Sequence, residues 1–499
     1  AALAIAGSVF GIQRYYAAHR LADEVDRELA AARADVEVAH EADTAQRELA
    51  ATAFAAFDRL DNTAGEALWD RTNERRAAAA GAYRSAARKA EAALAKDPTR
   101  SDARAMLGDI LVARAELADL MHDAVIRDES LDRIESYDPD GSRRERLNAP
   151  GRLDVRAAGK ISIDGRASGA DAVELSLPAG VHVVDVTAPL RAQIHELVLV
   201  EHGARTKLAF EAPPATAVPD GFIYLADGTS LFGSSADNET RRNFLSNVPL
   251  HPRQTAAFLI ARNEVTLGDW LAYVDAQPVA QRAALVPHIP LSGAAGGISV
   301  EHAPDGWRLS LQPIGRAYTA SWGEPLRYDG RDRRASQDWR RFPALGITAD
   351  EAEAYTAWLD RTGVLPHARL CTELEWNRAA RGADGRDTPS GNPLGPDDAN
   401  VDITYGRDHM GPDEVGSHPA AKSPYGAADM AGNAFEWTRG ERANTYVILG
   451  GSYYHDRKTA SLANRNEASK SLRDAAAGMR VCASIAMTEH REATVDSLK

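Results

Sequence analysis

The sequence predicts a multidomain chain with an N-terminal α-helical segment, a small β-sandwich and a C-terminal α+β domain. Three observations predict this order. Positions 12–64 contain neither glycine nor proline and show helical hydrophobic spacing. From Leu153 the hydrophobic period becomes two, which is typical of strands. Beyond residue 217, glycine and proline interrupt the chain frequently, which indicates a loop-rich domain.

Composition and charge restrict the function classes. Apolar residues make up 44% of the 499 positions, which excludes a wholly disordered chain. The 58 basic and 72 acidic residues give a net charge of −14, so we expect no nucleic-acid partner. The two cysteines, Cys371 and Cys482, are too few for a disulfide framework or a four-thiolate zinc site. We interpret both as small buried thiols.

Residues 1–12 are apolar, and Arg14, two tyrosines and Arg20 follow. Twelve residues are too few to span a bilayer, which needs about 20. One interpretation is the remnant of a membrane anchor, with the tyrosines at the interface. The protein would then contact a membrane through the segment preceding residue 13 and lie in the envelope, on the periplasmic or extracellular side. The alternative is the apolar start of an ordinary helix.

Residues 13–147 are predicted to be helical. Apolar residues recur every three or four positions over 21–39, which predicts a long amphipathic helix or a helical hairpin. Two alanine-rich helical patterns over 77–120 flank Asp97-Pro98, where proline ends one helix or begins the next. This pair resembles a tetratricopeptide repeat, and a generic helical hairpin is the alternative.

Residues 151–213 are predicted to form the small β-sandwich. Apolar residues alternate over 153–186, and Asp-Gly and Pro-Ala-Gly turns separate the runs. The peptides ISIDG and LPAGVHVVDV resemble the PEGA domain, a β module of bacterial envelope proteins. Nothing in them predicts catalysis, so we expect a structural spacer. A proline-rich stretch at 212–215 predicts a stiff linker.

Residues 217–490 contain several characteristic peptides. They include NEVTLGDW, FPALGITADEAEAYTAWL, ARLCTELEWNRAARGADGR, SPYGAADMAGNAFEWT, LGGSYYHDRKTASLANRNE and GMRVCAS. In this order they resemble the formylglycine-generating enzyme (sulfatase-modifying factor) family, whose fold is a glycine-rich α+β form of the C-type lectin-like fold. The residues agree with helices in this domain, because Ala349–Asp360 has helical spacing and Thr372 with Glu375 forms a capping box.

The resemblance also implies structural calcium. Two carboxylates flank a glycine-rich turn over 429–436, and hard oxygen donors suit Ca²⁺. The positions that match the family's second calcium site are Asp429, Gly432, Ala434 and Glu436. The positions that match the first site, after a one-residue gap, are Asn400, Val401, Asp408 and Met410. The alternative is that these carboxylates cap turns or pair with arginine.

The family's active site is changed in this chain. The resemblance implies a copper ion held by two cysteines that follow the serine of a Gly-Gly-Ser motif. That motif is Gly450-Gly451-Ser452 here, and the two cysteine positions hold His455 and Ala460. Because soft thiolates select Cu(I), we expect no copper and no formylglycine formation. A related iron-dependent branch needs a histidine-rich helical domain, whereas the helices before Asp140 contain three scattered histidines.

The turn after Gly-Gly-Ser is the candidate ligand surface, because the family holds its substrate peptide there. The ligand-binding candidates are Ser452, Tyr453, His455 and Arg457. An insertion, 277–341, carries three tryptophans that either bind ligand or cover the domain's own core. The expected partner is a protein, a peptide or a small-molecule ligand.

The leading hypothesis is therefore a non-catalytic ligand-binding or sensory domain of a bacterial membrane-associated protein. Similar bacterial arrays follow a receptor-type serine/threonine kinase, so by analogy an upstream kinase domain is a further expected partner. Two alternatives stay open. One is an oxidoreductase of the same family with altered chemistry that uses His455, and the other is a surface-display scaffold.

Overall fold

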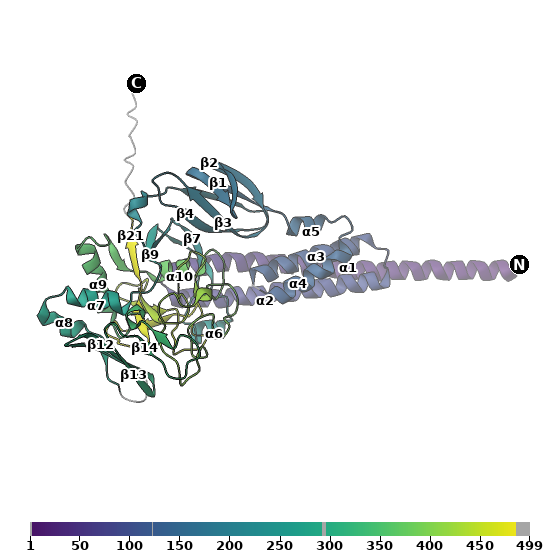
Figure 1. Cartoon of the computed structure of the whole chain (residues 1–499). Coiled ribbons are helices and arrows are strands. Elements are labelled where there is room, and N and C mark those ends of the chain that lie inside the picture. The colour runs from purple at the N-terminus through teal and green to yellow at the C-terminus, as the bar shows by residue number, and fades with distance from the viewer. Residues whose placement is uncertain (1, 122, 292–295, 486–499) are drawn as a thin grey trace, which may run out of the picture. The chain divides into compact units, whose positions relative to one another are not determined.

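The computed structural model describes residues 2–121, 123–291 and 296–485, with side chains from residue 10 onward (Figure 1). The chain divides into two compact units. One unit is the helical region up to Gly151 together with the short segment 201–204. The other unit contains residues 152–200 and the chain from Arg205 onward.

A long helical hairpin forms most of the first unit. Helices α1 (Ala2–Asp58) and α2 (Asn62–Lys96) pack along each other, as the hydrophobic spacing predicts. Small side chains, including Ala39 and Ala86, are buried in their shared core, so the two backbones approach closely. Asp61 begins α2, because its side chain accepts the N–H of Ala64. Among the described helices, none combines the length and the apolar composition that a membrane span needs.

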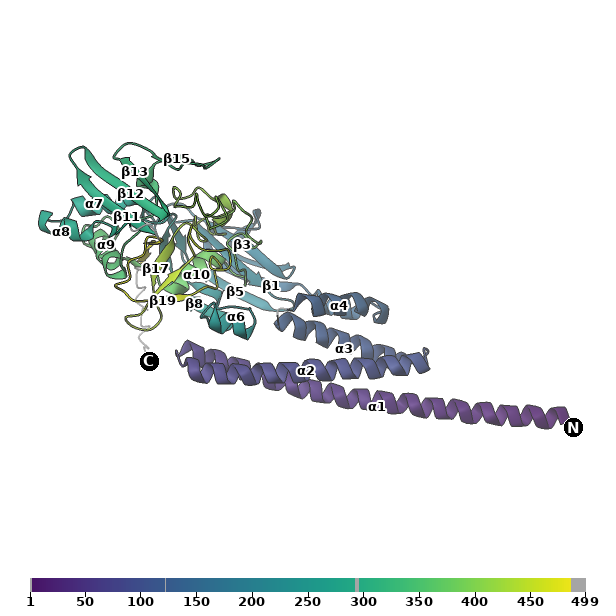
Figure 2. The same cartoon turned by 90° about the horizontal axis from the view of Figure 1, so that it is seen from below.

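Shorter helices complete this unit. They are α3 (Ser101–Leu120), α4 (Ala124–Ile134) and α5 (Ser142–Leu147), with a 3₁₀ turn η1 (Glu135–Tyr137). Helix α2 ends just before Asp97-Pro98, as the sequence predicts. Helices α2 and α3 lie side by side, as do α3 and α4 (Figure 2). The helical N-terminal region is thus confirmed, and the tetratricopeptide likeness stays a prediction.

The β module lies in the second unit. Its five strands are β1 (Gly151–Ile163), β2 (Arg166–Leu177), β3 (Gly180–Thr187), β4 (Ile194–Val200) and β5 (Arg205–Phe210). The sequence predicted a sandwich, whereas hydrogen bonds join all five described strands in one sheet. The first half of β1 pairs with β5 in parallel and its second half pairs with β3 antiparallel. Gly159 separates the halves with φ 131°, and a Cβ there would lie 2.5 Å from Thr187 O, so glycine is required.

A buried ion pair ties the β module to the C-terminal domain. Arg378 donates Nη2 to Glu196 Oε1 on β4 at 2.9 Å, and both side chains are almost fully buried. Tyr425 donates its hydroxyl to the same oxygen at 2.7 Å. Pro213 in the predicted linker accepts the N–H of Ala192 at 2.9 Å, so the linker lies against the module. The module and the domain therefore pack as one compact unit.

The C-terminal domain contains many short strands. They are β6 (Phe222–Leu225), β7 (Gly228–Phe232), β8 (His251–Thr255), β9 (Phe258–Ala261), β10 (His288–Ile289), β11 (Gly297–Ala303), β12 (Gly306–Ile314), β13 (Arg316–Ser321), β14 (Leu326–Arg327), β15 (Ser336–Gln337), β16 (Ala368–Leu370), β17 (Phe435–Arg439), β18 (Tyr446–Leu449), β19 (Asn466–Ala468), β20 (Ala477–Met479) and β21 (Val481–Ser484). Among the described residues they form three four-stranded sheets, ordered β10-β11-β12-β13, β16-β21-β9-β6 and β19-β18-β17-β20. Two pairs, β7-β8 and β14-β15, form smaller sheets.

Short helices lie between these strands (Figure 1). They are α6 (Asn238–Asn243), α7 (Leu267–Asp275), α8 (Val279–Leu285), α9 (Ala349–Arg361) and α10 (Glu373–Arg381), with 3₁₀ turns η2 (Ala215–Ala217), η3 (Trp339–Arg341) and η4 (Pro419–Ala421). Helix α9 confirms the predicted helix to within one residue. Helix α10 begins at the predicted capping box, where Thr372 accepts the N–H of Glu375 and the carboxylate of Glu375 accepts the N–H of Thr372. Gly382 ends it with φ 84°.

The two cysteines are joined to each other, which corrects the interpretation of separate buried thiols. Strands β16 and β21 pair antiparallel, with Leu370 opposite Val481. This pairing places Cys371, just after β16, beside Cys482 in β21, with their Cα atoms 4.8 Å apart. The sequence separation of 111 residues hid this contact, because it arises only when the two strands meet.

Candidate functional site

A glycine turn after strand β18 positions the candidate ligand residues. Gly450 and Gly451 have positive φ values of 92° and 74°, which glycine adopts without strain. A Cβ at Gly451 would lie 2.7 Å from the Cα of Ala460. The turn therefore packs against Ala460, which stands where the resemblance places the family's second cysteine.

A pocket of about 210 Å³ opens beside this loop. The residues that line it are Ile289, Gly296, Tyr453, Tyr454, His455, Arg473, Asp474, Ala475 and Ala476. Two of them, Ile289 and Gly296, come from the insertion. The pocket therefore joins two segments that are far apart in the sequence.

The four predicted ligand residues lie at different depths. His455 is half-buried and lines the pocket, and Tyr453 lines it from a fully buried position. Ser452 is fully buried and is not among the described lining residues. Arg457 is exposed and donates to Leu394 O at 2.6 Å. The structure thus brings Tyr453 and His455 to the pocket and leaves Ser452 and Arg457 outside it.

His455 is held in a fixed orientation. Its Nδ1 lies 2.7 Å from Ser452 Oγ, and its ring packs edge-on against Phe435 with centroids 4.9 Å apart. Burial lowers the pKa of His455 below its ordinary value, so the imidazole is neutral at pH 7. A neutral imidazole can accept a hydrogen bond or bind a metal through its other ring nitrogen.

The insertion forms a hairpin, β11–β12, that β10 and β13 extend. Trp307 and Trp339 are buried, and their Nε1 atoms donate to Asp275 and to the carbonyl of Ser321. Trp322 is 41% exposed and contacts Trp339 edge-on. None of the three tryptophans is among the described residues that line the pocket. Two of them therefore belong to the core of the domain.

The predicted second calcium site lies in a buried cluster of carboxylates. Glu436 accepts hydrogen bonds from Arg480 and from Trp376, each at 2.7 Å. Burial raises the pKa of Asp429 to about 6. Burial, Asp429 and Glu436 raise the pKa of Glu264 well above its usual value. Glu264 therefore belongs to this cluster as well.

The predicted first site is only partly enclosed. Asn400, Val401 and Met410 are buried, whereas Asp408 is exposed. Arg331 from the insertion donates hydrogen bonds to two carbonyl oxygens of the same loop. The guanidinium of Arg331 thus already occupies carbonyl oxygens of the loop that the resemblance assigns to calcium.

Three buried oxygens in these regions lack a hydrogen-bond partner among the described residues: Glu264 Oε1, Asn400 Oδ1 and Asp402 Oδ1. A hard cation satisfies such oxygens, so they fit Ca²⁺. In the described part of the chain, no group of three acidic, histidine or cysteine side chains is placed to hold a metal. Main-chain carbonyls, as the resemblance implies for Gly432 and Ala434, would have to complete the coordination.

Glu264, Arg473 and Asp474 lie at these sites but were not predicted from the sequence. Glu264 stands in NEVTLGDW, a peptide that carries the resemblance, so its place in a motif was an unused signal. Arg473 and Asp474 carry no local signal, because only the packing of their loop against the insertion brings them to the pocket.

Comparison with known proteins identifies the family. Residues 208–485 match the sulfatase-modifying factor enzyme 1-like domain. Hercynine oxygenase of Mycolicibacterium smegmatis is 27% identical over 233 residues, which are 46% of this chain and 45% of that protein. Formylglycine-generating enzyme of Mycobacterium tuberculosis is 27% identical over 237 residues, 44% of this chain and 75% of that protein.

The coverage of these relatives is partial. The chain spans less than half the length of the three hercynine oxygenases it matches. Among solved structures, PvdO from Pseudomonas aeruginosa is 22% identical with a TM-score of 0.36, covering 53% of this chain and 94% of that one. The family match itself covers more than half of the chain. The protein therefore belongs to the sulfatase-modifying factor family.

Proposed function

We propose that residues 208–485 form a non-catalytic member of the family that binds a ligand in the pocket beside His455. The observation that carries the proposal is the loss of both thiolates at the positions that the resemblance assigns to copper. Ala460 is fully buried against Gly451. The two cysteines of the chain are joined to each other at the β16–β21 pair. No thiolate is left to bind Cu(I).

The pocket suits a small molecule or a single side chain of a peptide. Its volume of about 210 Å³ lies below the range of roughly 300–1,000 Å³ that drug-sized ligands occupy. Arg473 donates to Gly346 O at 2.6 Å and pairs with Glu351, so its charge is already satisfied. Tyr454, Asp474 and the neutral His455 remain as the groups that select a ligand.

The wider role that we propose is sensory. The domain would report ligand binding within a bacterial membrane-associated protein, with a receptor-type serine/threonine kinase upstream. Calcium would be a structural ion held near Asn400 and Asp429. These parts of the proposal rest on architectural analogy and on the three unpartnered oxygens described above.

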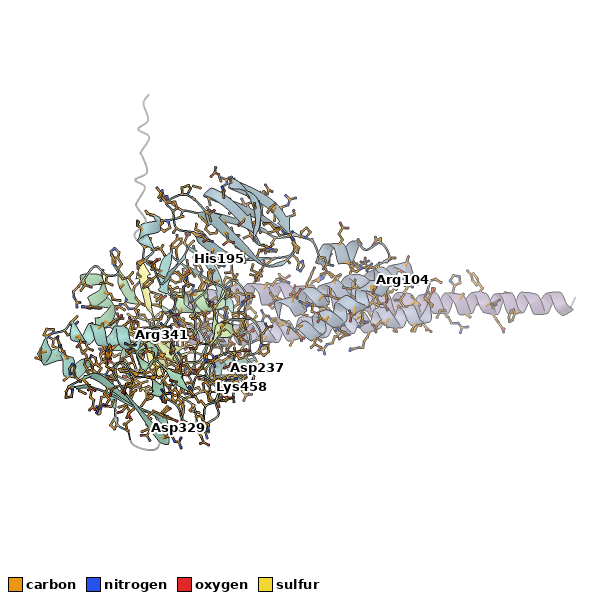
Figure 3. All side chains as sticks on the ribbon, viewed as in Figure 1. Arg104, His195, Asp237, Asp329, Arg341 and Lys458 are labelled. Atoms are coloured by element: carbon orange, nitrogen blue, oxygen red, sulfur yellow. A yellow bond between two sulfur atoms is a disulfide. The ribbon has the colours of Figure 1, made fainter. Side chains whose placement is uncertain are left out.

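A copper titration tests the proposal directly. The wild-type chain should not compete for Cu(I) with a colorimetric chelator, and it should leave the cysteine of a Cys-x-Pro-x-Arg peptide unchanged by mass. The double variant His455→Cys/Ala460→Cys should gain Cu(I) binding, because it restores two thiolates. Lys458→Ala, an exposed neighbour in the same loop (Figure 3), is the matched control. Formylglycine in the peptide after incubation with the wild type would contradict the proposal.

A second candidate function is an oxidoreductase with altered chemistry. The observation that favours it is that the relatives are named as an oxygenase and as formylglycine-generating enzyme, while the pocket keeps a neutral imidazole. Oxygen consumption with Cu(I) or Fe(II) and a thiol peptide separates the two functions. Consumption that His455→Ala abolishes and Lys458→Ala leaves unchanged would favour the oxidoreductase.

A further inference from the structure

A second pocket lies within the helical unit, outside the residues that match the family. Its volume is about 180 Å³. The residues that line it are Ala80, Arg84, Arg114, Leu117, Ala118, Met121, Asp123 and Ile126. They come from α2, α3 and the start of α4, three helices that pack side by side (Figure 2).

Arg114 is a charged residue at a core position of this pocket. It is 8% exposed, and its guanidinium donates no hydrogen bond within the described residues. Its ion pair with Glu129 is 3.9 Å long, and Glu129 lies closer, at 3.5 Å, to Arg133. The side-chain nitrogens of Arg114 are not among the described atoms that are buried without a hydrogen-bond partner, so they reach the open space of the pocket. An anion in the pocket would supply what Arg114 lacks.

Arg84 adds a second positive charge to the lining. Its Nε donates to Ala80 O at 3.4 Å, and it forms no ion pair with the described carboxylates. Asp123 is the acidic residue of the lining, and its side chain is engaged in capping α4 by accepting the N–H of Ile126. Among the described lining residues, the two arginines face one aspartate whose carboxylate is engaged in this cap, so a ligand carboxylate would bind to the arginines.

The remaining residues of the lining are apolar, and they limit the size and polarity of the part of the ligand that they enclose. Leu117, Met121 and Ile126 provide aliphatic and thioether surface, and two alanines leave space between them. A dry cavity of about 150 Å³ with such walls accommodates a benzene ring. The volume therefore fits a short alkyl chain or one aromatic ring.

We propose that this pocket binds a small organic monocarboxylate with a short aliphatic or aromatic body. Arg114 and Arg84 hold the carboxylate, because guanidinium groups match its two oxygens in a planar fork. The apolar walls bury the body of the ligand, which adds the hydrophobic part of the affinity. The helical unit would then be a sensor in its own right, independent of the pocket beside His455.

Calorimetric titration of the full chain with sodium benzoate and sodium hexanoate tests this proposal. Both acids should bind saturably, and benzamide and hexanamide, which lack the charge, should bind at least about tenfold more weakly. Arg114→Gln should weaken benzoate binding by at least about tenfold. Arg104→Gln is the matched control on the same helix, because the Arg104 side chain is exposed and, among the described residues, donates a single long hydrogen bond, to Pro98 O at 3.4 Å (Figure 3). It should bind benzoate like the wild type.

Circular dichroism melting shows whether Arg114→Gln still folds. If it does not, Arg84→Gln replaces it, because Arg84 is exposed and its loss leaves the helix core intact. Absence of saturable binding by either acid overturns the proposal, as does equal binding of the acids and their amides. Tighter binding of a peptide that ends in a free carboxylate than of benzoate would also overturn it, in favour of a chain terminus.

Discussion

Replacing Glu196 by alanine should destabilise the second unit strongly. The substitution removes the carboxylate that pairs with the fully buried Arg378 and accepts the hydroxyl of Tyr425. After the change, Arg378 keeps its hydrogen bond to Thr255 Oγ1 at 2.6 Å but has no counterion. Removing one partner of a buried ion pair costs about 3–5 kcal/mol. At about 2 °C per kcal/mol for a unit of this size, the melting temperature should fall by about 6–10 °C.

Urea unfolding followed by tryptophan fluorescence measures this loss. Seven of the eight tryptophans, all except Trp69, lie in the second unit, so the signal reports mainly on it. Glu174→Ala is the matched control, because Glu174 is on the same sheet and its side chain is 58% exposed. The control should change the free energy of unfolding by less than about 0.5 kcal/mol.

Removing both charges of the pair should restore stability. The double variant Glu196→Leu/Arg378→Met removes both charges, and buried pairs replaced by apolar residues are often neutral in stability. The double variant should recover most of the free energy of unfolding that Glu196→Ala loses. If Glu196→Ala costs no more than Glu174→Ala, the ion pair does not hold the module to the domain and the reasoning is refuted.

Three further predictions concern the same unit. Loss of the Cys371–Cys482 disulfide should lower the free energy of unfolding by up to about 4.7 kcal/mol, because the disulfide closes a loop of about 100 residues. Urea unfolding of the double variant Cys371→Ala/Cys482→Ala measures this loss, and an unchanged unfolding midpoint would contradict the prediction. Chelation by EDTA should lower the melting temperature, since an ion that binds only the folded state adds about 2.7 kcal/mol at a hundredfold excess over Kd, and Glu436→Ala should abolish the response; a melting curve indifferent to EDTA removes the calcium assignment. NMR should show His455 titrating below its ordinary pKa, because the ring is buried. The contribution of the neutral imidazole to stability is then lost as pH falls through the lowered pKa of His455. A titration at or above the ordinary value would refute the burial of this ring.

Local patterns in the sequence predicted much of this fold. The capping box at Thr372 and the end of α2 before Asp97 depend on contacts within a few residues, so spacing alone indicates them. The single sheet of the β module was not predicted, because the division of β1 between two partners depends on Gly159 approaching Thr187, 28 positions away.

The candidate sites also depend on contacts between residues that are distant in the sequence, which local patterns do not predict. His455 could be selected from its place after Gly-Gly-Ser, but its pocket depends on Ile289 and Gly296 in the insertion. Arg114 did carry a local signal, since it interrupts the apolar pattern of LGDILVARAELADL. A charge at a core position indicates a binding site only when its surroundings are known, and those come from two other helices.

The disulfide has a consequence for how the domain tolerates cleavage. It encloses the chain from Cys371 to Cys482, which includes the pocket loop and the predicted cation ligands. A protease that cuts one exposed bond in this ring, for example near Arg407, would leave both pieces covalently attached. The nicked protein would run as one band without reductant and as two with it. Cleavage within the ring would therefore leave β21 covalently bonded to the chain beside β16.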